Sequence, residues 1–406
     1  MFSHKKIKAS KYALKKPWLS TGLLKSIKKK NSLYKKFLKS PSPLNESSYK
    51  RYKNKLNHYL RLAKRYYEVK LKTLKNNIKE TWNILNQIIN HAKRPYKLPS
   101  TSVASSNQDI SDLIANQFCN FFTILGRSLA KKIPTSVNTY RSFLPERSFS
   151  SFFFESATQC EIVEIAKSHR TNIAAGHDKV PMWCVKESIN YISEPLTCIS
   201  NSAINSVVVP DQLKLACVVP LFKSGDKRIF SNYRPVSVLR IFSKFFEKNA
   251  YFGLINYLDK RKLLASNQYS FRKNHSTSLA LLYLYDKIAA AVDERKYTAG
   301  LFLDLSKAFD TVNHSILLGK LEHYGIPGLA LEWVKSYLCK RLQYVEFSAV
   351  SSSYKEILCG VPQGSVLGPL IFLIYINDIC HLFNVYYLAL FADDTNLFFS
   401  QNDIQT

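Results

Sequence analysis

Two adjacent aspartates, Asp393 and Asp394, stand between two apolar stretches of the chain. Residues 386–391 form the first apolar run, and residues 395–399 form a second run that contains β-branched and aromatic side chains, a pattern that predicts a β-hairpin. Hairpins that serve stability alone favour Asn-Gly or Asp-Gly turns, and adjacent carboxylates repel each other where they are half-buried. The turn is therefore either a site for divalent cations or an ordinary solvated loop, and both interpretations fit this stretch by itself.

A third aspartate, Asp304, ends another apolar segment. Residues 299–303 predict a buried strand, and an acidic residue at the end of such a strand is costly unless it is paired or bound to a metal. We expect Asp304 to lie on a strand adjacent to Asp393 and Asp394, so that three carboxylates converge on the same ions. Two Mg²⁺ ions roughly 3.5 to 4 Å apart, with Mn²⁺ as an alternative, would suit a phosphoryl transfer.

Five segments, in order along the chain, resemble the motifs of one enzyme family. They span residues 218–239, 268–277, 301–314, 360–379 and 391–398. These segments are similar to motifs of the reverse transcriptases of jockey-type non-LTR retrotransposons. The resemblance extends over about half of the chain. It implies an α+β fold with right-hand fingers and palm, in which an antiparallel sheet packs against helices, preceded by a basic helical N-terminal extension. It also implies an RNA-directed DNA polymerase that uses an RNA template, a DNA primer or target, and deoxynucleoside triphosphates (dNTPs).

The resemblance assigns roles to further residues. The catalytic and metal-binding residues would be Asp304, Asp393 and Asp394, and the nucleotide-binding residues would be Lys223, Arg234, Phe309, Gln363 and Gly364. Lys223 and Arg234 lie on opposite arms of a predicted hairpin, where an ammonium group and a guanidinium fork could hold a triphosphate. The ring of Phe309 could exclude a 2′-hydroxyl, although its spacing fits a core aromatic equally well. Arg272 would contact a phosphate.

Positive charge is concentrated at the N-terminal end of the chain. Residues 1–100 contain 27 Lys and Arg against three acidic residues, a net charge of +24 that leaves only +5 for the other 306 residues. Such an asymmetry indicates a polyanionic partner, and nucleic acid is the leading candidate. We expect nucleic-acid contacts from Lys28, Lys29, Lys30, Lys64 and Arg65. Tyrosines along an amphipathic helix predicted over residues 48–90 could stack on unpaired bases or pack in a core.

The predicted domains are a basic helical extension (residues 1–95), a connecting helix with loops (96–155) and a reverse transcriptase domain (156–406). No apolar run is long enough to span a membrane and no secretory signal is evident, so we expect a protein of the nucleus or cytoplasm without a membrane partner. The eight cysteines have no zinc-finger spacing. By the resemblance, we expect the chain to lack an endonuclease and a thumb.

Three hypotheses follow from these patterns. The first is RNA-directed DNA synthesis at the three aspartates. The second is a catalytically inactive remnant that binds RNA or DNA through its basic N-terminal residues. The third is a chain that cannot close its core and gives no stably folded product. The sequence leaves the oligomeric state open.

Overall fold

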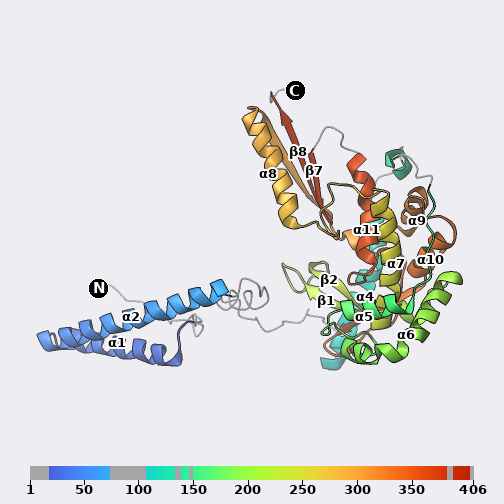
Figure 1. The fold of residues 1–406 in the computed structure, drawn as a ribbon. Coiled ribbons are helices and arrows are strands. Elements are labelled where there is room, and N and C mark those ends of the chain that lie inside the picture. Colours follow the sequence, from blue (N-terminus) through green and yellow to red (C-terminus); the bar gives the residue numbers. More distant parts are fainter. Residues whose placement is uncertain (1–17, 74–106, 133–138, 146–149, 382–386, 403–406) are drawn as a thin grey trace. The chain divides into compact units, whose positions relative to one another are not determined.

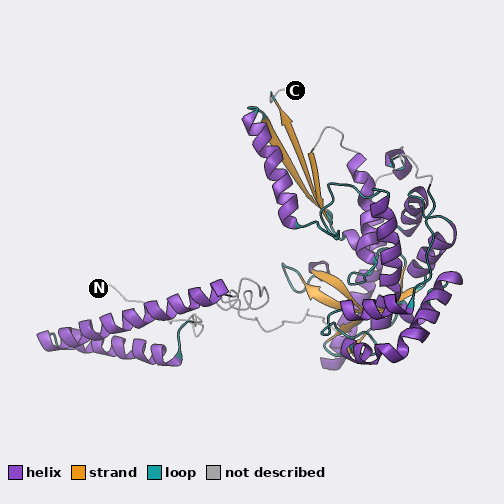
Figure 2. Cartoon of the chain, in the orientation of Figure 1, coloured by secondary structure: helices purple, strands orange, loops and turns teal. Residues whose placement is uncertain are grey.

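The computed structural model describes residues 18–73, 107–132, 139–145, 150–381 and 387–402. The chain divides into two compact units, Met1–Lys97 and Leu98–Thr406. The described residues combine helices with an antiparallel sheet and a mixed sheet, so the chain has both α and β structure (Figure 2). The domain boundaries predicted after residues 95 and 155 stay predictions.

The first unit contains two helices, α1 (Thr21–Lys39) and α2 (Pro43–Thr73). The side chain of Ser20 caps α1 by accepting a hydrogen bond from the backbone N–H of Leu23. The two helices pack against each other near the turn that joins them, where the rings of Tyr34 and Tyr49 lie 5.1 Å apart. The predicted helix over residues 48–90 therefore begins earlier than expected, and its part after residue 73 lies outside the described residues.

The described residues of the second unit include eight α-helices. They are α4 (Asn107–Ala130), α5 (Gln159–Ser168), α6 (Met182–Asn205), α7 (Ile241–Lys260), α8 (Thr277–Asp293), α9 (His314–His323), α10 (Gly328–Leu338) and α11 (Gly368–Ile376). Several begin at a side chain that satisfies free backbone N–H groups. Thr158 and Glu161 form a capping box at α5, Ser276 caps α8 and Asn313 caps α9.

The first sheet of this unit has the strand order β2-β1-β4-β5, with β6 also paired to β4. Its strands are β1 (Leu215–Phe222), β2 (Tyr233–Leu239), β4 (Arg341–Phe347), β5 (Val350–Ser351) and β6 (Lys355–Ile357). The sheet is mixed, because β1 runs parallel to β4 and the other pairs are antiparallel. Helix α4 packs on it through aromatic side chains, with the ring of Phe118 lying edge-on to that of Tyr233 at 4.9 Å.

The second sheet is antiparallel and has the order β3-β8-β7. Its strands are β3 (Tyr297–Asp304), β8 (Asp394–Gln401) and β7 (Tyr387–Phe391). Helix α8 runs alongside this sheet and contacts β3 and β7 (Figure 1). On the outer side of β7, the segment before α8 adds backbone hydrogen bonds, from Leu390 N–H to Asn267 and from Tyr269 N–H to Leu390. Both edge strands of this sheet, β3 and β7, therefore contact α8 or the segment that precedes α8.

The largest hydrophobic cluster lies among α7, α9, α10 and α11. Trp333, Leu317 and Ile371 are almost completely buried in it. At its margin Lys320 and Asp378 form a buried ion pair with an N–O distance of 2.5 Å. Among the described residues, no helix has the length and apolar character needed to cross a membrane.

The burial of this cluster predicts the effect of shortening one of its side chains. Leu317→Ala removes a side chain that is 0% exposed, and the lost transfer free energy plus the cavity should lower the free energy of unfolding by about 2 to 5 kcal/mol. Leu329→Ala makes the same change at a side chain that is 66% exposed, on the neighbouring helix. Urea unfolding followed by circular dichroism measures both, and equal destabilisation by the two changes would contradict the described packing.

Candidate functional site

Two of the three predicted catalytic aspartates lie directly opposite each other. Strands β3 and β8 are antiparallel neighbours, and their register pairs Asp304 with Asp394. Asp394 is also the pairing partner of Phe391 on β7. Asp393 precedes Asp394 in the β7–β8 turn, and its carbonyl oxygen lies 3.5 Å from the backbone nitrogen of Leu305. All three aspartates thus occupy one end of one sheet.

The turn that carries these aspartates is held by Gln268. Ala392, at the centre of the turn, has a φ of +58°, in the left-handed region that non-glycine residues rarely adopt. The side-chain oxygen of Gln268 accepts hydrogen bonds from the backbone N–H groups of Ala392 and Ser270. Gln268 is 3% exposed, so these bonds form away from solvent. The contacts compensate for the unusual backbone and fix the position from which Asp393 and Asp394 project.

The electrostatic state of Asp394 reflects its acidic neighbours. Partial desolvation raises the pKa of Asp394, the negative charges of Asp393 and Asp304 raise it further, and the positive charge of Lys223 lowers it. Throughout the described residues, no group of three or more His, Cys, Asp or Glu side chains converges closely enough to hold a metal ion. The side chains at this end of the sheet nevertheless suit a divalent cation in their chemistry. Carboxylates that repel one another supply the oxygen ligands that Mg²⁺ binds.

One cation, Lys223, acts on Asp394, and its charge and that of Arg234 also act on Lys307. Lys223 and Arg234 are exposed at the two ends of the β1–β2 connection, and Lys307 follows β3 in the turn after Asp304. The positive charges of Lys223 and Arg234 lower the pKa of Lys307, in addition to the larger effect of burial. The ammonium group of Lys307 donates a hydrogen bond to the carbonyl of Tyr233 at 2.7 Å. Lys307 therefore links the turn after β3 to strand β2.

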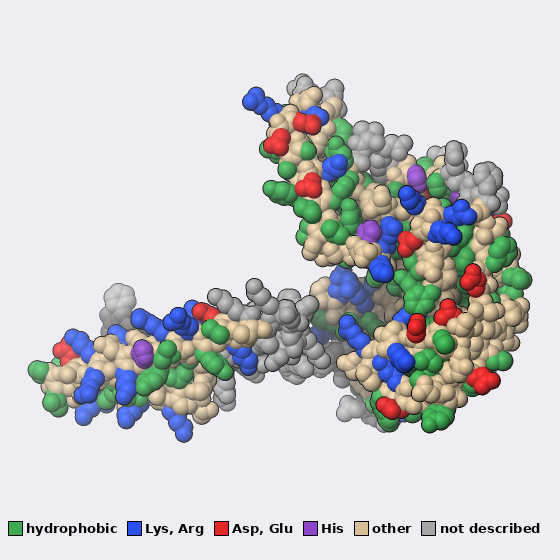
Figure 3. Space-filling model, in the orientation of Figure 1, with side chains coloured by type: hydrophobic (Ala, Val, Ile, Leu, Met, Phe, Trp, Pro, Cys, Tyr) green, Lys and Arg blue, Asp and Glu red, His purple; other side chains and the backbone are tan. Residues whose placement is uncertain are grey.

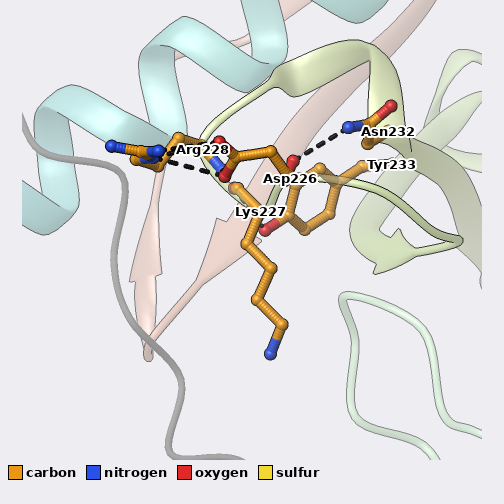
Figure 4. Close-up of polar contacts among 5 residues, drawn as sticks. All are labelled: Asp226, Lys227, Arg228, Asn232 and Tyr233. Atoms are coloured by element: carbon orange, nitrogen blue, oxygen red, sulfur yellow. Dashed lines mark hydrogen bonds and ion pairs between the residues drawn. The ribbon is translucent and has the colours of Figure 1, made fainter.

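The β1–β2 connection is ordered by its own polar contacts (Figure 4). The guanidinium of Arg228 and the carboxylate of Asp226 are 2.9 Å apart, and this pairing lowers the pKa of Asp226. Asn232 donates to the carbonyl of Asp226, and the Tyr233 hydroxyl donates to that of Lys227. These hydrogen bonds connect residues within the loop. Lys223 and Arg234 therefore lie at the two ends of an ordered connection.

The loop over residues 360–367, named here the 360s loop, is tied to the turn that follows β3. Backbone N–H groups of Gly360 and Val361 donate to the carbonyls of Val312 and Phe309, both at 2.8 Å. The Gln363 side chain donates to Asp310 Oδ1 at 2.8 Å. Gly364 has a φ of +121°, and a Cβ there would lie 2.4 Å from the carbonyl oxygen of Ser237, so only glycine suits this close approach to β2.

The ring of Phe309 has two aromatic neighbours. It stacks on Phe372 of α11, with ring centroids 4.5 Å apart, and lies edge-on to Phe271 at 6.1 Å. The ring is partly buried and packs against the main hydrophobic cluster. Its packing supports the core interpretation, and its exclusion of a 2′-hydroxyl stays a prediction.

Asp310 is a site residue that the sequence analysis did not single out. Burial raises its pKa to about 6, against the opposing effects of the Gln363 hydrogen bond and the charge of Lys307. Its second oxygen, Oδ2, has no hydrogen-bond partner among the described residues. Asp310 also lines a cavity of about 30 Å³, which has room for one water molecule. The carboxylate thus orients the amide of Gln363 in a partly dehydrated environment.

Other predicted residues lie apart from this group. The Arg272 guanidinium donates to the carbonyl of Ala265 at 2.7 Å and lies 3.5 Å from Asp259, so it has partners within the chain, and its phosphate contact stays a prediction. The predicted nucleic-acid contacts of the first unit lie on its two helices. Lys28, Lys29 and Lys30 are on α1, and Lys64 and Arg65 are on α2.

Three residues of the site were missed, namely Gln268, Lys307 and Asp310. Lys307 and Asp310 flank Phe309 within a motif already recognised, and their charge next to a strand carrying Asp304 was the available signal. Gln268 acts through its side-chain oxygen on a turn more than 120 residues away. No local pattern in the sequence indicates that contact.

The pKa of Asp310 predicts a pH-dependent difference in stability. The folded chain binds the Asp310 proton more tightly than the unfolded chain, so this group makes stability fall as pH rises from its usual pKa of 3.8 to about 6. Asp310→Asn cannot titrate, and its free energy of unfolding relative to wild type should increase across that window and then level off. Urea unfolding at pH 4, 5, 6 and 7 measures this, with Asp286→Asn on the exposed face of α8 as the matched control. A difference that stays constant with pH would rule out the raised pKa.

Comparison with known proteins finds a family match for part of the chain. Residues 223–405 match the reverse transcriptase (RNA-dependent DNA polymerase) family. The chain is 32% identical over 240 residues to the "Probable RNA-directed DNA polymerase from transposon X-element" of Drosophila melanogaster, which covers 58% of this chain and 26% of that protein. It is 26% identical over 395 residues to the corresponding protein of transposon BS from the same organism, covering 92% of this chain and 42% of that protein.

A third relative is the RNA-directed DNA polymerase from the mobile element jockey of Drosophila melanogaster. It is 34% identical over 184 residues, covering 45% of this chain and 20% of that protein. The chain therefore spans less than half the length of each of these three relatives. Their names and the family match agree with the motifs read from the sequence. Residues 223–405 thus match the reverse transcriptase family, and the chain is similar to RNA-directed DNA polymerases of transposons and of the mobile element jockey.

Proposed function

We propose that this chain catalyses RNA-directed DNA synthesis, adding nucleotides to a primer 3′-hydroxyl. The observation that carries the proposal is the pairing of Asp304 with Asp394 at the end of two adjacent strands, with Asp393 beside them. These carboxylates lie in the residues that match the reverse transcriptase family. In this assignment the β3-β8-β7 sheet is the palm and the β1–β2 hairpin belongs to the fingers.

Reverse transcriptases generally use divalent metal ions, and we assign Asp304, Asp393 and Asp394 as the residues that hold two Mg²⁺ ions, with Mn²⁺ as an alternative. Bound there, the cations would lower the pKa of the primer 3′-hydroxyl and neutralise the departing pyrophosphate. The carboxylates supply the charge that binds them. Desolvation raises the pKa of Asp394, and the repulsion from Asp393 and Asp304 that raises it further is relieved when a divalent cation is bound.

The cations near the aspartates bind the dNTP in this proposal. Lys223 and Arg234 contact the triphosphate, with Arg234 as a bidentate donor. Lys307, in the turn after β3, adds a third positive charge to this group. It belongs with Lys223 and Arg234 because the charges of both act on it. Gln363 and the backbone of Gly364 face the nucleotide or template base, and Phe309 bounds the sugar.

The basic first unit binds the RNA or DNA substrate. Helices α1 and α2 carry 16 Lys and Arg side chains against two acidic ones, Glu46 and Glu68. Figure 3 shows Lys and Arg side chains spread over these helices among hydrophobic and other side chains. A polyanion is the partner that matches this charge. The same observation supports a second candidate function, in which the chain binds nucleic acid through these helices without catalysis.

The first test separates catalysis from binding. Asp393→Asn combined with Asp394→Asn should lower primer extension on an RNA template with Mg²⁺ by more than about 100-fold, because the carboxylates that hold the cations are lost. Extension of a labelled DNA primer on a gel measures the change.

The control for this test makes the same charge change elsewhere. Asp286→Asn combined with Asp293→Asn alters two exposed carboxylates of α8 and should leave extension within about twofold of wild type. Equal extension by the two double variants would exclude the assigned aspartates. Absence of extension by the wild-type chain, with RNA binding retained, would favour the binding function.

The second test concerns the basic helices. Replacing Lys28, Lys29 and Lys30 by Gln should weaken RNA binding and reduce the slope of log K against log salt by about 2, since each lost phosphate contact removes roughly 0.7 to 0.9. Fluorescence anisotropy with a labelled single-stranded RNA at several salt concentrations measures the slope. Replacing Lys167, Arg170 and Lys179, all exposed in the second unit, by Gln removes the same charge and should change the slope less. Identical slopes for both variants would indicate that total charge, not α1, determines binding.

A further inference from the structure

The strongest unexplained feature near the site is a buried carboxylate on α7. Glu247 is 1% exposed. One of its oxygens, Oε2, accepts hydrogen bonds from the backbone N–H groups of Val366 at 2.5 Å and Leu367 at 3.3 Å. The other oxygen lies 3.2 Å from the Ser243 hydroxyl. A buried charge of this kind is expensive and therefore calls for a specific partner.

The two N–H groups that Glu247 accepts from stand at the start of α11. Leu367 is the N-cap of this helix, and its own side chain makes no capping hydrogen bond. Glu247 thus caps α11 from a different helix, more than 100 residues earlier in the chain. A negative charge at a helix N-terminus is favourable because it lies near the positive end of the helix dipole.

Arg341, at the start of β4, supplies positive charge that acts on Glu247. Burial raises the pKa of Glu247, while the positive charge of Arg341 and the two backbone N–H groups lower it. Arg341 is 1% exposed and donates through Nη1 to the carbonyl of Tyr337. Its Nε and Nη2 have no hydrogen-bond partner within the described residues. Removal of Glu247 alone would therefore leave a buried cation without its counter-charge.

The residues that Glu247 holds end the 360s loop. The other end of this loop is bonded to Phe309 and Val312, and its middle is bonded to β2, where Ser237 N–H donates to the carbonyl of Gln363 at 2.7 Å. The loop is thus fixed at its start, middle and end. A shift of the last attachment would change the backbone next to Gln363 and Gly364.

We propose that Glu247, compensated by Arg341, is a positioning residue for the nucleotide site: by holding Val366 and Leu367 it fixes the 360s loop, and with it Gln363 and Gly364, in the geometry that binds the dNTP. This inference rests on the proposed function, because that function assigns the dNTP to this loop. Glu247 touches no reacting atom. Its effect should therefore appear in nucleotide binding more than in turnover.

The test removes both buried charges together. Glu247→Met combined with Arg341→Met removes the buried carboxylate and the buried guanidinium together, and replacement of a buried ion pair by apolar side chains is often neutral or stabilising. The loop loses its acceptor, so we expect the KM for dNTP to rise about tenfold while kcat stays within about threefold of wild type. Glu247→Asp is the second variant, for use if the double variant fails to fold. It keeps the negative charge but shortens the side chain by one methylene, so it should also raise the KM for dNTP. Glu187→Met, on the exposed side of α6, is the matched control.

Hydrogen–deuterium exchange provides a readout that needs no turnover. In the wild-type chain, Mg²⁺ and dTTP should slow exchange of the peptide covering residues 360–367. The Glu247 variants should exchange faster there without nucleotide and should need about tenfold more dTTP for the same protection. Unchanged KM and unchanged protection in folded Glu247 variants would overturn the positioning role. Absence of both primer extension and nucleotide protection in wild type would instead overturn the proposed function, and the positioning role with it.

Discussion

Repulsion between carboxylates at one end of the β3-β8-β7 sheet is the constraint on which the rest of the site depends. Asp304 and Asp394 are cross-strand partners, and like charges in that arrangement destabilise a sheet. A sheet selected for stability alone would place other residues there. The unfavourable interaction between these carboxylates is present in the fold, and neighbouring elements hold the strands in register. These elements include α8 along the sheet and the backbone of residues 267–269 beside β7.

A cation from a distant part of the chain offsets this negative charge. Lys223 comes from the end of β1, and its charge lowers the pKa of Asp394. Lys307 comes from the turn after β3 and binds the backbone of β2. The contact joins the sheet that carries the aspartates to the sheet that carries Lys223 and Arg234. Opposite charges therefore come from two separate sheets, which is suited to a charged substrate that lies between them.

The sequence was sufficient for the elements whose signal is local. The hairpin around Asp393 and Asp394, the strand ending at Asp304 and the helix after residue 276 are all present, because apolar runs and capping residues specify them directly. The prediction that residues 299–303 are buried is wrong, because these residues of β3 are exposed in the structure. Contacts between segments that are distant in the sequence could not be predicted. The bonds from Gln268 to Ala392 and from Glu247 to Leu367 each depend on a side chain that finds a backbone group more than 100 residues away. No periodicity or spacing carries that information.

The positive φ of Ala392 limits what this turn can contain. The residue is 7% exposed, and its backbone adopts a conformation that β-branched side chains tolerate poorly. Substitution by valine, isoleucine or threonine would strain the backbone at the point where Gln268 holds it, and a larger side chain would have little room. Glycine would fit but would give up the restriction that alanine places on the unfolded chain. The backbone conformation therefore limits which amino acids can replace Ala392 during evolution. This limit is independent of any selection on the two acidic residues that follow.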